Sequence, residues 1–409
     1  MNRDSNIVRT RKPSRILVVH NEYQQKGGED RVVEDEIELL RNQGHEVRLF
    51  SKHNKSIDST TALSLFLGTV WSRRVESEIR AEIASFEPDV MHVHNTFPLI
   101  SPSIYWAAAR ANVPVVQTLH NFRLLCVQAM FLRNDQICED CLGRLPWRGV
   151  VRQCYRNSMA QSATTTIMLG VHRAISTYRE KVTRFIALSE FAKSKFIASK
   201  QLTADQLVVK PNFVDIAFKP TADARKGGVV VGRLSREKGL HVLVAALDKL
   251  KQADVEVIGT GPEQNALKNS AKITLLGWRA KDFITDRMRA ARYLLLPSIC
   301  YENFPRTLVE AFACGLPVIA SRLGALPEIV QEGYNGLLFD PGSAEDLANK
   351  IEWADNHPQE MAEMGRNARI TYENKYTAKQ NYRQLIQIYD EALAAASRTP
   401  IPAVAQQQA

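Results

Sequence analysis

The chain has 409 residues, of which 45% are hydrophobic and 24% charged, and it carries a formal net charge of +9. This length predicts two domains, and the composition is that of a globular protein and excludes a collagen-like or coiled-coil chain. No apolar run reaches the roughly 18 residues of a membrane span, and six cysteines are too few for a disulfide scaffold. Residues 1–14 lack the apolar core of a secretory signal, so we expect a flexible N-terminus and a cytoplasmic chain.

From residue 15 onward, short apolar runs alternate with helical patterns. Strands are predicted at residues 15–20, 47–50, 90–93, 115–119 and 185–188. A helix is predicted over 29–43, where Gly44 would stop it, and another is predicted to begin after Ser189 as its N-cap. This alternation predicts a parallel sheet covered on both faces, in an N-terminal domain at 15–207 that carries an insertion at 122–156.

The pattern starts again after a proline-bearing linker at 208–220. Strands are predicted at residues 228–231, 255–258, 273–276, 293–296 and 318–321, in a second α/β domain at 221–375. Parallel sheets bind ligands at the carboxyl ends of their strands, so the two domains predict a ligand cleft between them. Residues 376–397 predict a C-terminal helix that packs back toward the N-domain, and 398–409 predict a disordered tail.

The strand at 228–231 leads into a basic glycine loop, G-R-L-S-R-E-K-G, at residues 232–239. Free N–H groups at the following helix N-terminus, with Arg233 and Lys238, would hold a diphosphate, although a basic surface turn is the alternative. The next strand also ends in a glycine turn, and we expect Gly259 and Gly261 to let the backbone approach a ligand or the first turn. That turn lacks the third glycine and the acidic residue of a dinucleotide fingerprint, which argues against a nicotinamide cofactor.

Two glutamates stand eight positions apart in the stretch S-I-C-Y-E-N-F-P-R-T-L-V-E-A-F-A-C-G-L-P-V-I-A-S. Glu302 falls in the loop after a strand and Glu310 inside the next helix, so they would act at separate places along one ligand. A carboxylate can accept two hydroxyl hydrogen bonds, which suits the vicinal diols of a sugar and of a ribose. The alternative is a helix cap and a surface glutamate, but the following G-L-P and S-R-L-G-A-L-P-E motifs favour a site.

Six motifs follow one another over about residues 225–370, namely GRLSREKG, GTGPE, LLGW, YENFPRTLVEAFACGLPVIAS, GALPEIV and NGLLFDPG. In this order they resemble the carboxyl-terminal domain of the retaining glycosyltransferases of family four. The first half is similar to the acceptor domain of the same family at residues 21–32, 88–95 and 118–121. The resemblance implies the GT-B architecture, with two Rossmann-like domains facing each other. It also implies transfer of a hexose from a nucleoside diphosphate donor to a glycan or lipid-linked acceptor, with retention of anomeric configuration, in polysaccharide or cell-envelope synthesis.

The resemblance implies roles for individual residues as well. Arg233 and Lys238 would neutralise the diphosphate, Glu302 would contact the donor sugar and Glu310 the ribose. His120, at the end of a predicted strand, would contact the transferred sugar. The implied donor-binding set further includes Gly27, Gly28, Gly232, Gly277, Arg279, Asn303, Phe304, Pro305 and Arg306. Cations placed at the leaving diphosphate favour the reaction, and because the chain has no D-x-D motif we expect no catalytic metal.

Four cysteines in the insertion have the spacing C-x11-C-x2-C-x12-C, at Cys126, Cys138, Cys141 and Cys154. A C-x-x-C pair with two flanking cysteines suits a tetrahedral structural zinc, which would staple a loop-rich segment with little core. Isolated buried thiols and a redox pair are the alternatives.

Between residues 144 and 184 only Glu180 opposes eight basic residues, namely Arg144, Arg148, Arg152, Arg156, Arg173, Arg179, Lys181 and Arg184. This stretch predicts an anionic membrane surface or lipid phosphate as a partner, with peripheral association at the inner face of the membrane. A solvated face is the alternative, and no nucleic acid is expected because a nucleic-acid-binding protein would leave the whole second domain unexplained. The rival functions are a sugar-nucleotide epimerase or phosphorylase of the same fold, and a zinc-stapled nucleic-acid-binding protein.

Overall fold

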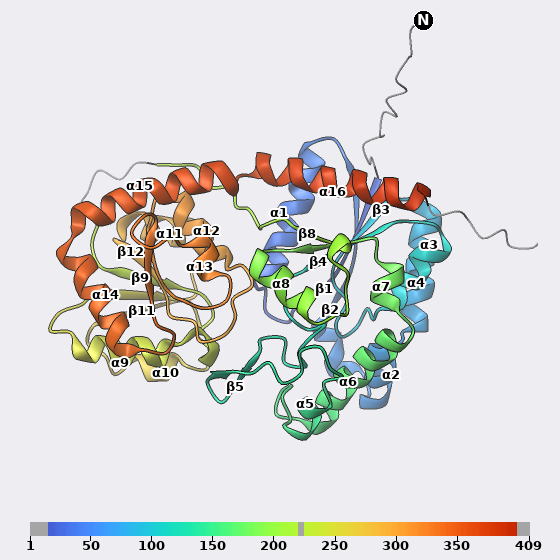
Figure 1. Ribbon diagram of the computed structural model, residues 1–409, viewed down its shortest axis with the longest axis horizontal. Coiled ribbons are helices and arrows are strands. Elements are labelled where there is room, and N and C mark those ends of the chain that lie inside the picture. Colours follow the sequence, from blue (N-terminus) through green and yellow to red (C-terminus); the bar gives the residue numbers. More distant parts are fainter. Residues whose placement is uncertain (1–14, 220–224, 399–409) are drawn as a thin grey trace, which may run out of the picture.

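The computed structural model describes residues 15–219 and 225–398, which form two α/β domains, each built on a six-stranded parallel sheet (Figure 1). The predicted fold class, with two Rossmann-like domains, is confirmed. The predictions made for residues 1–14 and 399–409 lie outside the described residues.

The N-terminal sheet has the strand order β2-β1-β3-β4-β7-β8. Its strands are β1 (Arg15–Glu22), β2 (Glu46–His53), β3 (Val90–Asn95), β4 (Val115–Leu119), β7 (Arg184–Ala187) and β8 (Leu207–Val209). All five strands predicted here are found, and β8 was not predicted because three apolar residues carry no periodicity. The pairing of Phe185 with Leu207 gives β8 its place, so the sheet extends to Val209, two residues into the predicted linker.

Helices cover both faces of this sheet. They are α1 (Gly28–Asn42), α2 (Ala62–Val70), α3 (Arg73–Phe86), α4 (Ser103–Arg110), α6 (Met159–Ala174), α7 (Thr177–Lys181) and α8 (Glu190–Ala198), with 3₁₀ turns at Asn54–Ser59 and Ala204–Gln206. Ser189 caps α8 as predicted, because its side chain accepts a hydrogen bond from the Ala192 N–H. The cysteine-bearing insertion contributes the hairpin β5 (Leu132–Arg133) and β6 (Gln136–Ile137) and the short helix α5 (Trp147–Val151).

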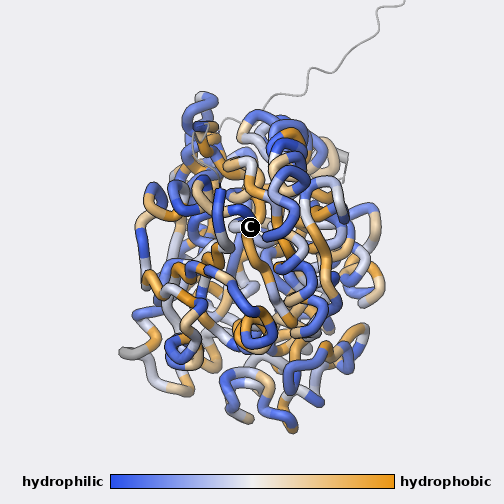
Figure 2. The backbone as a smooth tube through the Cα atoms, turned by 90° about the vertical axis from the view of Figure 1, so that its left-hand side faces the viewer, coloured by the Kyte–Doolittle hydropathy of each residue, from blue (hydrophilic) through white to orange (hydrophobic). Residues whose placement is uncertain are grey.

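The C-terminal sheet has the order β11-β10-β9-β12-β13-β14. Its strands are β9 (Gly228–Val231), β10 (Val255–Ile258), β11 (Ile273–Gly277), β12 (Tyr293–Leu296), β13 (Val318–Ser321) and β14 (Gly336–Phe339). Its helices are α9 (Leu240–Lys249), α10 (Gln264–Leu267), α11 (Lys281–Ala290), α12 (Arg306–Ala313), α13 (Leu326–Ile329), α14 (Ala344–Asn356) and α15 (Pro358–Lys375), and a 3₁₀ turn lies at Arg236–Lys238. Hydrophobic segments run through the middle of the molecule and hydrophilic ones over its outer turns (Figure 2). The edge strand β14 was not predicted.

The last helix, α16 (Ala378–Arg398), leaves the C-terminal domain and crosses to the N-terminal one (Figure 1). There it contacts α1, β3 and β4. Its buried face completes a core of the N-terminal domain with residues of β1, α1 and β3, and that face consists of Leu385, Ile386, Ile388, Tyr389 and Ala392.

Candidate functional site

The basic glycine loop follows β9 and packs closely against two other loops of its domain. Gly239 has φ +68°, and a Cβ there would lie 1.8 Å from the Pro297 carbonyl oxygen, so only glycine fits. A Cβ at Gly259 would lie 1.8 Å from the Gly232 oxygen, and one at Gly261 2.3 Å from the Leu234 oxygen. These two glycines therefore allow close approach to the first turn, which is one of the two uses expected of them.

Lys238 and Glu302 form an ion pair beside this loop. Lys238 Nζ lies 2.7 Å from Glu302 Oε1, which also accepts a hydrogen bond of 2.6 Å from the Ser298 hydroxyl. Burial opposes the charge of Glu302, but Lys238 and Ser298 more than offset it, so the pKa of Glu302 is lowered. Arg233 lies in the same loop and is exposed.

Glu310 is held on α12 by Arg306, one turn earlier on the same helix. Arg306 Nε lies 2.9 Å from Glu310 Oε1, and the same guanidinium pairs with Asp35 on α1 of the other domain. One arginine thus connects the predicted ribose carboxylate to the N-terminal domain. Phe304 and Asn303, also in the predicted donor set, are buried, whereas Pro305 is partly exposed.

His120 directly follows β4, where the two domains touch. Asn303 Nδ2 donates a buried hydrogen bond of 2.7 Å to the carbonyl oxygen of Leu119. The loop that carries Glu302 is therefore bonded to the residue before His120. Burial, and then the neighbouring His94, lower the pKa of His120 well below its usual value, so the ring is neutral.

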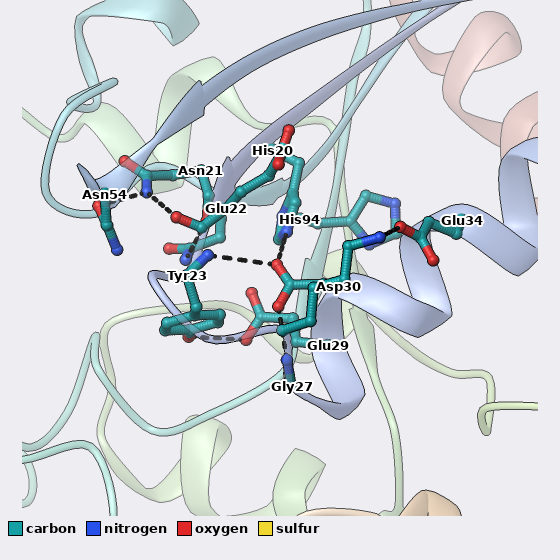
Figure 3. Close-up of polar contacts among 12 residues, drawn as sticks. His20, Asn21, Glu22, Tyr23, Gly27, Glu29, Asp30, Glu34, Asn54 and His94 are labelled. Carbon is teal, nitrogen blue, oxygen red and sulfur yellow. Dashed lines mark hydrogen bonds and ion pairs between the residues drawn. The ribbon is translucent and has the colours of Figure 1, made fainter. Parts of the chain in front are cut away.

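Gly27 and Gly28 stand at the start of α1, in a loop organised by Asp30 (Figure 3). Asp30 accepts hydrogen bonds from the Gly27 N–H at 2.7 Å and from the Tyr23 N–H at 3.3 Å, and it lies 2.8 Å from His20 Nε2. Burial opposes the charge of Asp30, but these bonds offset it and the pKa of the carboxyl is lowered. The loop is thereby tied to the end of β1.

Glu29, next to these glycines, was not singled out from the sequence. The Tyr23 hydroxyl donates to its Oε2 at 2.9 Å, while Oε1 is buried and has no hydrogen-bond partner among the described residues (Figure 3). Burial raises the pKa of Glu29 to about 7, although the charge of His20 and the Tyr23 bond act against it.

A second cluster missed from the sequence lies beneath His120. Glu36 of α1 meets His92 and His94 of β3, and all three are buried. Lys210 Nζ lies 3.0 Å from Glu36 Oε2, and His94 Nδ1 lies 2.9 Å from His120 Nε2. His92, inside the strand predicted at residues 90–93, and His94 directly after it were the available signal, because a buried polar side chain needs partners.

The four cysteines of the insertion converge. Cys138 follows β6 and its N–H donates to the Phe131 oxygen, while burial and then the thiols of Cys126, Cys154 and Cys138 raise the pKa of Cys141 to about 11. All are free thiols. Within the described residues the sulfurs do not form a group in which three lie within 4.8 Å of one another, whereas Glu36, His92 and His94 do.

The same insertion contacts the donor-side loops. Tyr301 OH donates to Glu139 Oε1 at 2.7 Å, and Lys195 Nζ lies 2.6 Å from the same oxygen. Arg236, in the basic glycine loop, pairs with Asp135 of the β5–β6 turn at 2.6 Å. The insertion therefore bridges the two domains.

The eight basic residues do not all face solvent as one surface. Arg173 donates to the carbonyl oxygens of Arg144 and Leu124, and Arg152 pairs with Asp140. Arg148 and Arg156 instead lie over the rings of Trp147 and Tyr155. Within 15–219 and 225–398, no helix combines the length and the apolar character needed to span a bilayer.

A cavity of about 270 Å³ lies at the domain junction, near the linker. Its lining includes Leu188, Pro211, Glu328 and Tyr376. Of the predicted site residues its lining includes Phe304 alone, and neither His120 nor Glu302 lines it.

Comparison with known proteins covers both domains. The family model for glycosyltransferase family 4 matches residues 26–218, and the model for glycosyl transferases group 1 matches residues 216–371. An uncharacterized glycosyltransferase of Methanocaldococcus jannaschii is 32% identical over 170 residues, which are 40% of this chain and 48% of that protein. For the first curated relatives, the matched region spans only 25% to 51% of the relative's own length.

Solved structures of the same fold match nearly the whole chain. Sucrose-phosphate synthase from Thermosynechococcus elongatus superposes with a TM-score of 0.70 at 21% identity, covering 93% of this chain and all of that one. The HepE protein of Anabaena, solved in complex with UDP-glucose, superposes with a TM-score of 0.65 at 20% identity, covering 91% of this chain and 98% of that one. Both show that the two domains have the GT-B arrangement.

Proposed function

The chain belongs to the glycosyltransferases in which a family 4 domain precedes a group 1 domain, and on that premise we propose that it transfers a hexose from a nucleoside diphosphate donor to a hydroxyl of a glycan or lipid-linked acceptor. The observation that supports the proposal is that Asn303, next to Glu302 of the Lys238–Glu302 ion pair, donates a hydrogen bond to Leu119, next to His120. A cation, a carboxylate and a neutral imidazole are the groups that such a donor needs.

Breaking the sugar–phosphate bond develops negative charge on the leaving diphosphate. Arg233 and Lys238 would stabilise that charge, together with the backbone N–H groups of the loop. Lys238 is held in place by Glu302 before the donor arrives, so its side chain would need little reordering. Glu302 would then accept hydroxyl hydrogen bonds from the sugar, and Glu310 would accept those of the ribose.

The donor we propose is a UDP-hexose, because the Anabaena neighbour was solved with UDP-glucose. Thermal unfolding in the presence of UDP, GDP and ADP tests this, since a ligand that binds only the folded state raises the midpoint. UDP should raise it most. An equal or absent response to all three nucleotides would contradict the donor assignment.

We propose retention of anomeric configuration, with the leaving phosphate oxygen taking the acceptor proton and no covalent nucleophile on the enzyme. In this scheme the exposed Arg233 and the paired Lys238 would act on the leaving-group side. Nuclear magnetic resonance of the first product formed from an α-linked donor should show an α-glycoside, and a β-glycoside would contradict retention.

The four converging cysteines support a structural zinc that would fix the bridging insertion. Zinc would hold Cys126, Cys138, Cys141 and Cys154 as thiolates, after side-chain rotations that bring the sulfurs together. The hydrogen bond of the Gly149 backbone to the Cys141 thiol would stabilise such a thiolate. The metal would serve the fold and take no part in sugar transfer.

The proposal of an acceptor at an anionic membrane surface rests on α2, α5 and α6 at one edge of the N-terminal domain, where α6 contacts both α2 and α5 (Figure 1). These helices and the adjacent loop leave large apolar side chains in solvent, notably Leu63 (68% exposed), Trp147 (57%) and Val151 (65%). Arg148 stands beside them. Apolar side chains bordered by arginine suit peripheral binding to anionic lipid at the inner face of a membrane, where polysaccharide or envelope glycans are assembled.

A further inference from the structure

His120 ends a chain of buried polar side chains that begins at Lys210 in the linker. Lys210 Nζ lies 3.0 Å from Glu36 Oε2, and Glu36 Oε1 lies 3.4 Å from His94 Nε2, without the alignment of a good hydrogen bond. On the opposite side of the same ring, His94 Nδ1 lies 2.9 Å from His120 Nε2. The two ring planes are inclined by 21° and their centroids lie 5.2 Å apart, which suits an in-plane hydrogen bond between the facing nitrogens.

The charge on Glu36 decides where the proton of His94 lies. Burial opposes that charge, but Lys210, and then His92, lower the pKa of Glu36, so it is a carboxylate. A ring nitrogen 3.4 Å from a buried carboxylate oxygen carries its proton there, because a lone pair in that position would be repelled. Burial, and then His92, lower the pKa of His94 to about 3, so the ring is neutral and its Nδ1 accepts.

With His94 Nδ1 as an acceptor, the proton between the two rings belongs to His120 Nε2. We propose that Glu36 and His94 are positioning residues that hold His120 as the Nε2–H tautomer and leave its Nδ1 as a hydrogen-bond acceptor for a donor-sugar hydroxyl. Among the described residues His120 Nδ1 has no hydrogen-bond partner, and the ring is partly exposed. The inference rests on the proposed function, in which His120 contacts the transferred sugar.

The cluster does not need a metal ion to be stable, although its atoms lie close enough to hold one. Lys210 already neutralises Glu36. His92 has its own partners, with Tyr389 OH 2.7 Å from Nδ1 and Thr118 Oγ1 2.9 Å from Nε2. His92 Nδ1 lies 3.0 Å from Glu36 Oε1, so His92 shares the burial and the carboxylate of His94. No hydrogen bond among the described residues joins it to His120, which makes it a matched control.

A long-range ¹⁵N–¹H spectrum of protein labelled in its nine histidines shows which ring nitrogen carries the proton. The His120 signals can be assigned by their loss in His120→Gln. We expect the wild-type His120 ring to be neutral and protonated at Nε2 near pH 7. A ring protonated at Nδ1, or at both nitrogens, would overturn the inference, and this measurement needs no other variant to fold.

Two variants then test the positioning role. His94→Gln should give a mixture of His120 tautomers, and UDP release from UDP-glucose should fall by about tenfold or more, as happens when a histidine loses the group that orients it. His92→Gln should leave the His120 tautomer unchanged. An unchanged tautomer in a folded His94→Gln protein would refute the role of His94.

A donor-analogue experiment separates acceptance from donation by His120. The test uses UDP-glucose analogues in which a single hydroxyl is replaced by hydrogen or by fluorine. At the position that meets Nδ1, the fluorinated analogue should be as poor a substrate as the deoxygenated one, because fluorine cannot donate a hydrogen bond. If each of the singly fluorinated analogues were turned over as fast as UDP-glucose, the inference would be overturned. If the wild type does not bind UDP at all, the proposed function fails, while the tautomer can still be measured.

Discussion

Lys238 and Glu302 hold each other in a partly buried ion pair, so removing either has consequences beyond catalysis. Lys238→Met would leave Ser298 as the remaining hydrogen-bond partner of the Glu302 carboxylate. We expect the unfolding free energy at pH 7 to fall by about 1 to 3 kcal/mol, which is less than for a fully buried pair because the pair is partly exposed. The pKa of Glu302 lies below its ordinary value of 4.5, so the pair stabilises the fold above about pH 4.5. Urea unfolding should show the deficit at pH 7 and a smaller one as the pH falls through the folded pKa. An equal deficit at both ends of this range would contradict the pairing.

Arg233→Met is the matched variant, since Arg233 lies in the same loop and is exposed. Its unfolding free energy should match the wild type within about 0.5 kcal/mol. Turnover of UDP-glucose should fall about 30-fold or more, because the variant loses a cation that acts mainly in the transition state. Wild-type turnover in this variant would remove Arg233 from the diphosphate site.

The two glutamates should differ in the ligand that they affect. Glu310→Gln should weaken UDP binding, since Glu310 would accept ribose hydroxyls and its partner Arg306 also pairs with Asp35. Glu302→Gln frees Lys238 for the diphosphate, so UDP affinity should be unchanged or greater while turnover falls. Calorimetry with UDP measures both, and equal losses of affinity would contradict these roles.

At the scale of elements, the cysteine-bearing insertion should lose its shape without metal. Metal analysis should find about one zinc per chain, and Cys138→Ser with Cys141→Ser should lower zinc content and acceptor-dependent turnover. UDP binding at the C-terminal domain should persist. Cys314→Ser is the control, because that buried thiol lies outside the insertion, at the C-terminal end of α12. A metal-free protein with full activity would end the zinc proposal.

The arginines in and near α5 and α6 should contribute unequally to membrane binding. Arg148→Gln and Arg156→Gln should weaken sedimentation with vesicles rich in phosphatidylglycerol, each by about 1 kcal/mol and less at high salt. Arg152→Gln should change it least, because Arg152 is paired with Asp140. Trp147→Ser should weaken the binding in a manner insensitive to salt. Vesicle binding that is the same in all four variants as in the wild type would contradict the proposed membrane-binding surface.

At the scale of the whole molecule, the N-terminal domain depends on the last helix of the chain. Deleting residues 378–409 would remove the five buried residues of α16 and expose the core that they cover. At about 1.5 to 3 kcal/mol for each large side chain, this approaches the total stability of a domain. The truncated protein should not give a cooperative unfolding transition for its N-terminal half. Deleting only residues 399–409 should leave thermal unfolding unchanged, and an unaffected 1–377 protein would show that α16 is dispensable.

The sequence by itself determined the two domains, ten of their strands and the motifs of the donor side. Apolar runs such as residues 293–296 predict strands wherever they occur, because they are buried on both faces of a parallel sheet. Residues close along the chain were also placed correctly relative to the elements. Glu302 precedes α12 and Glu310 lies within it, as the spacing requires.

The tertiary structure alone decided the partners of these residues. Strand β8 has only three residues and β14 lies at the edge of its sheet. Pairing with β7 and with β13, rather than periodicity, gives these strands their place. Lys210, Glu36, His94 and His120 come from the linker, α1, β3 and the end of β4, and separations of up to 174 residues hide their contact from any local pattern. Their protonation follows from burial and from the charges packed around them, which exist only once the chain has folded.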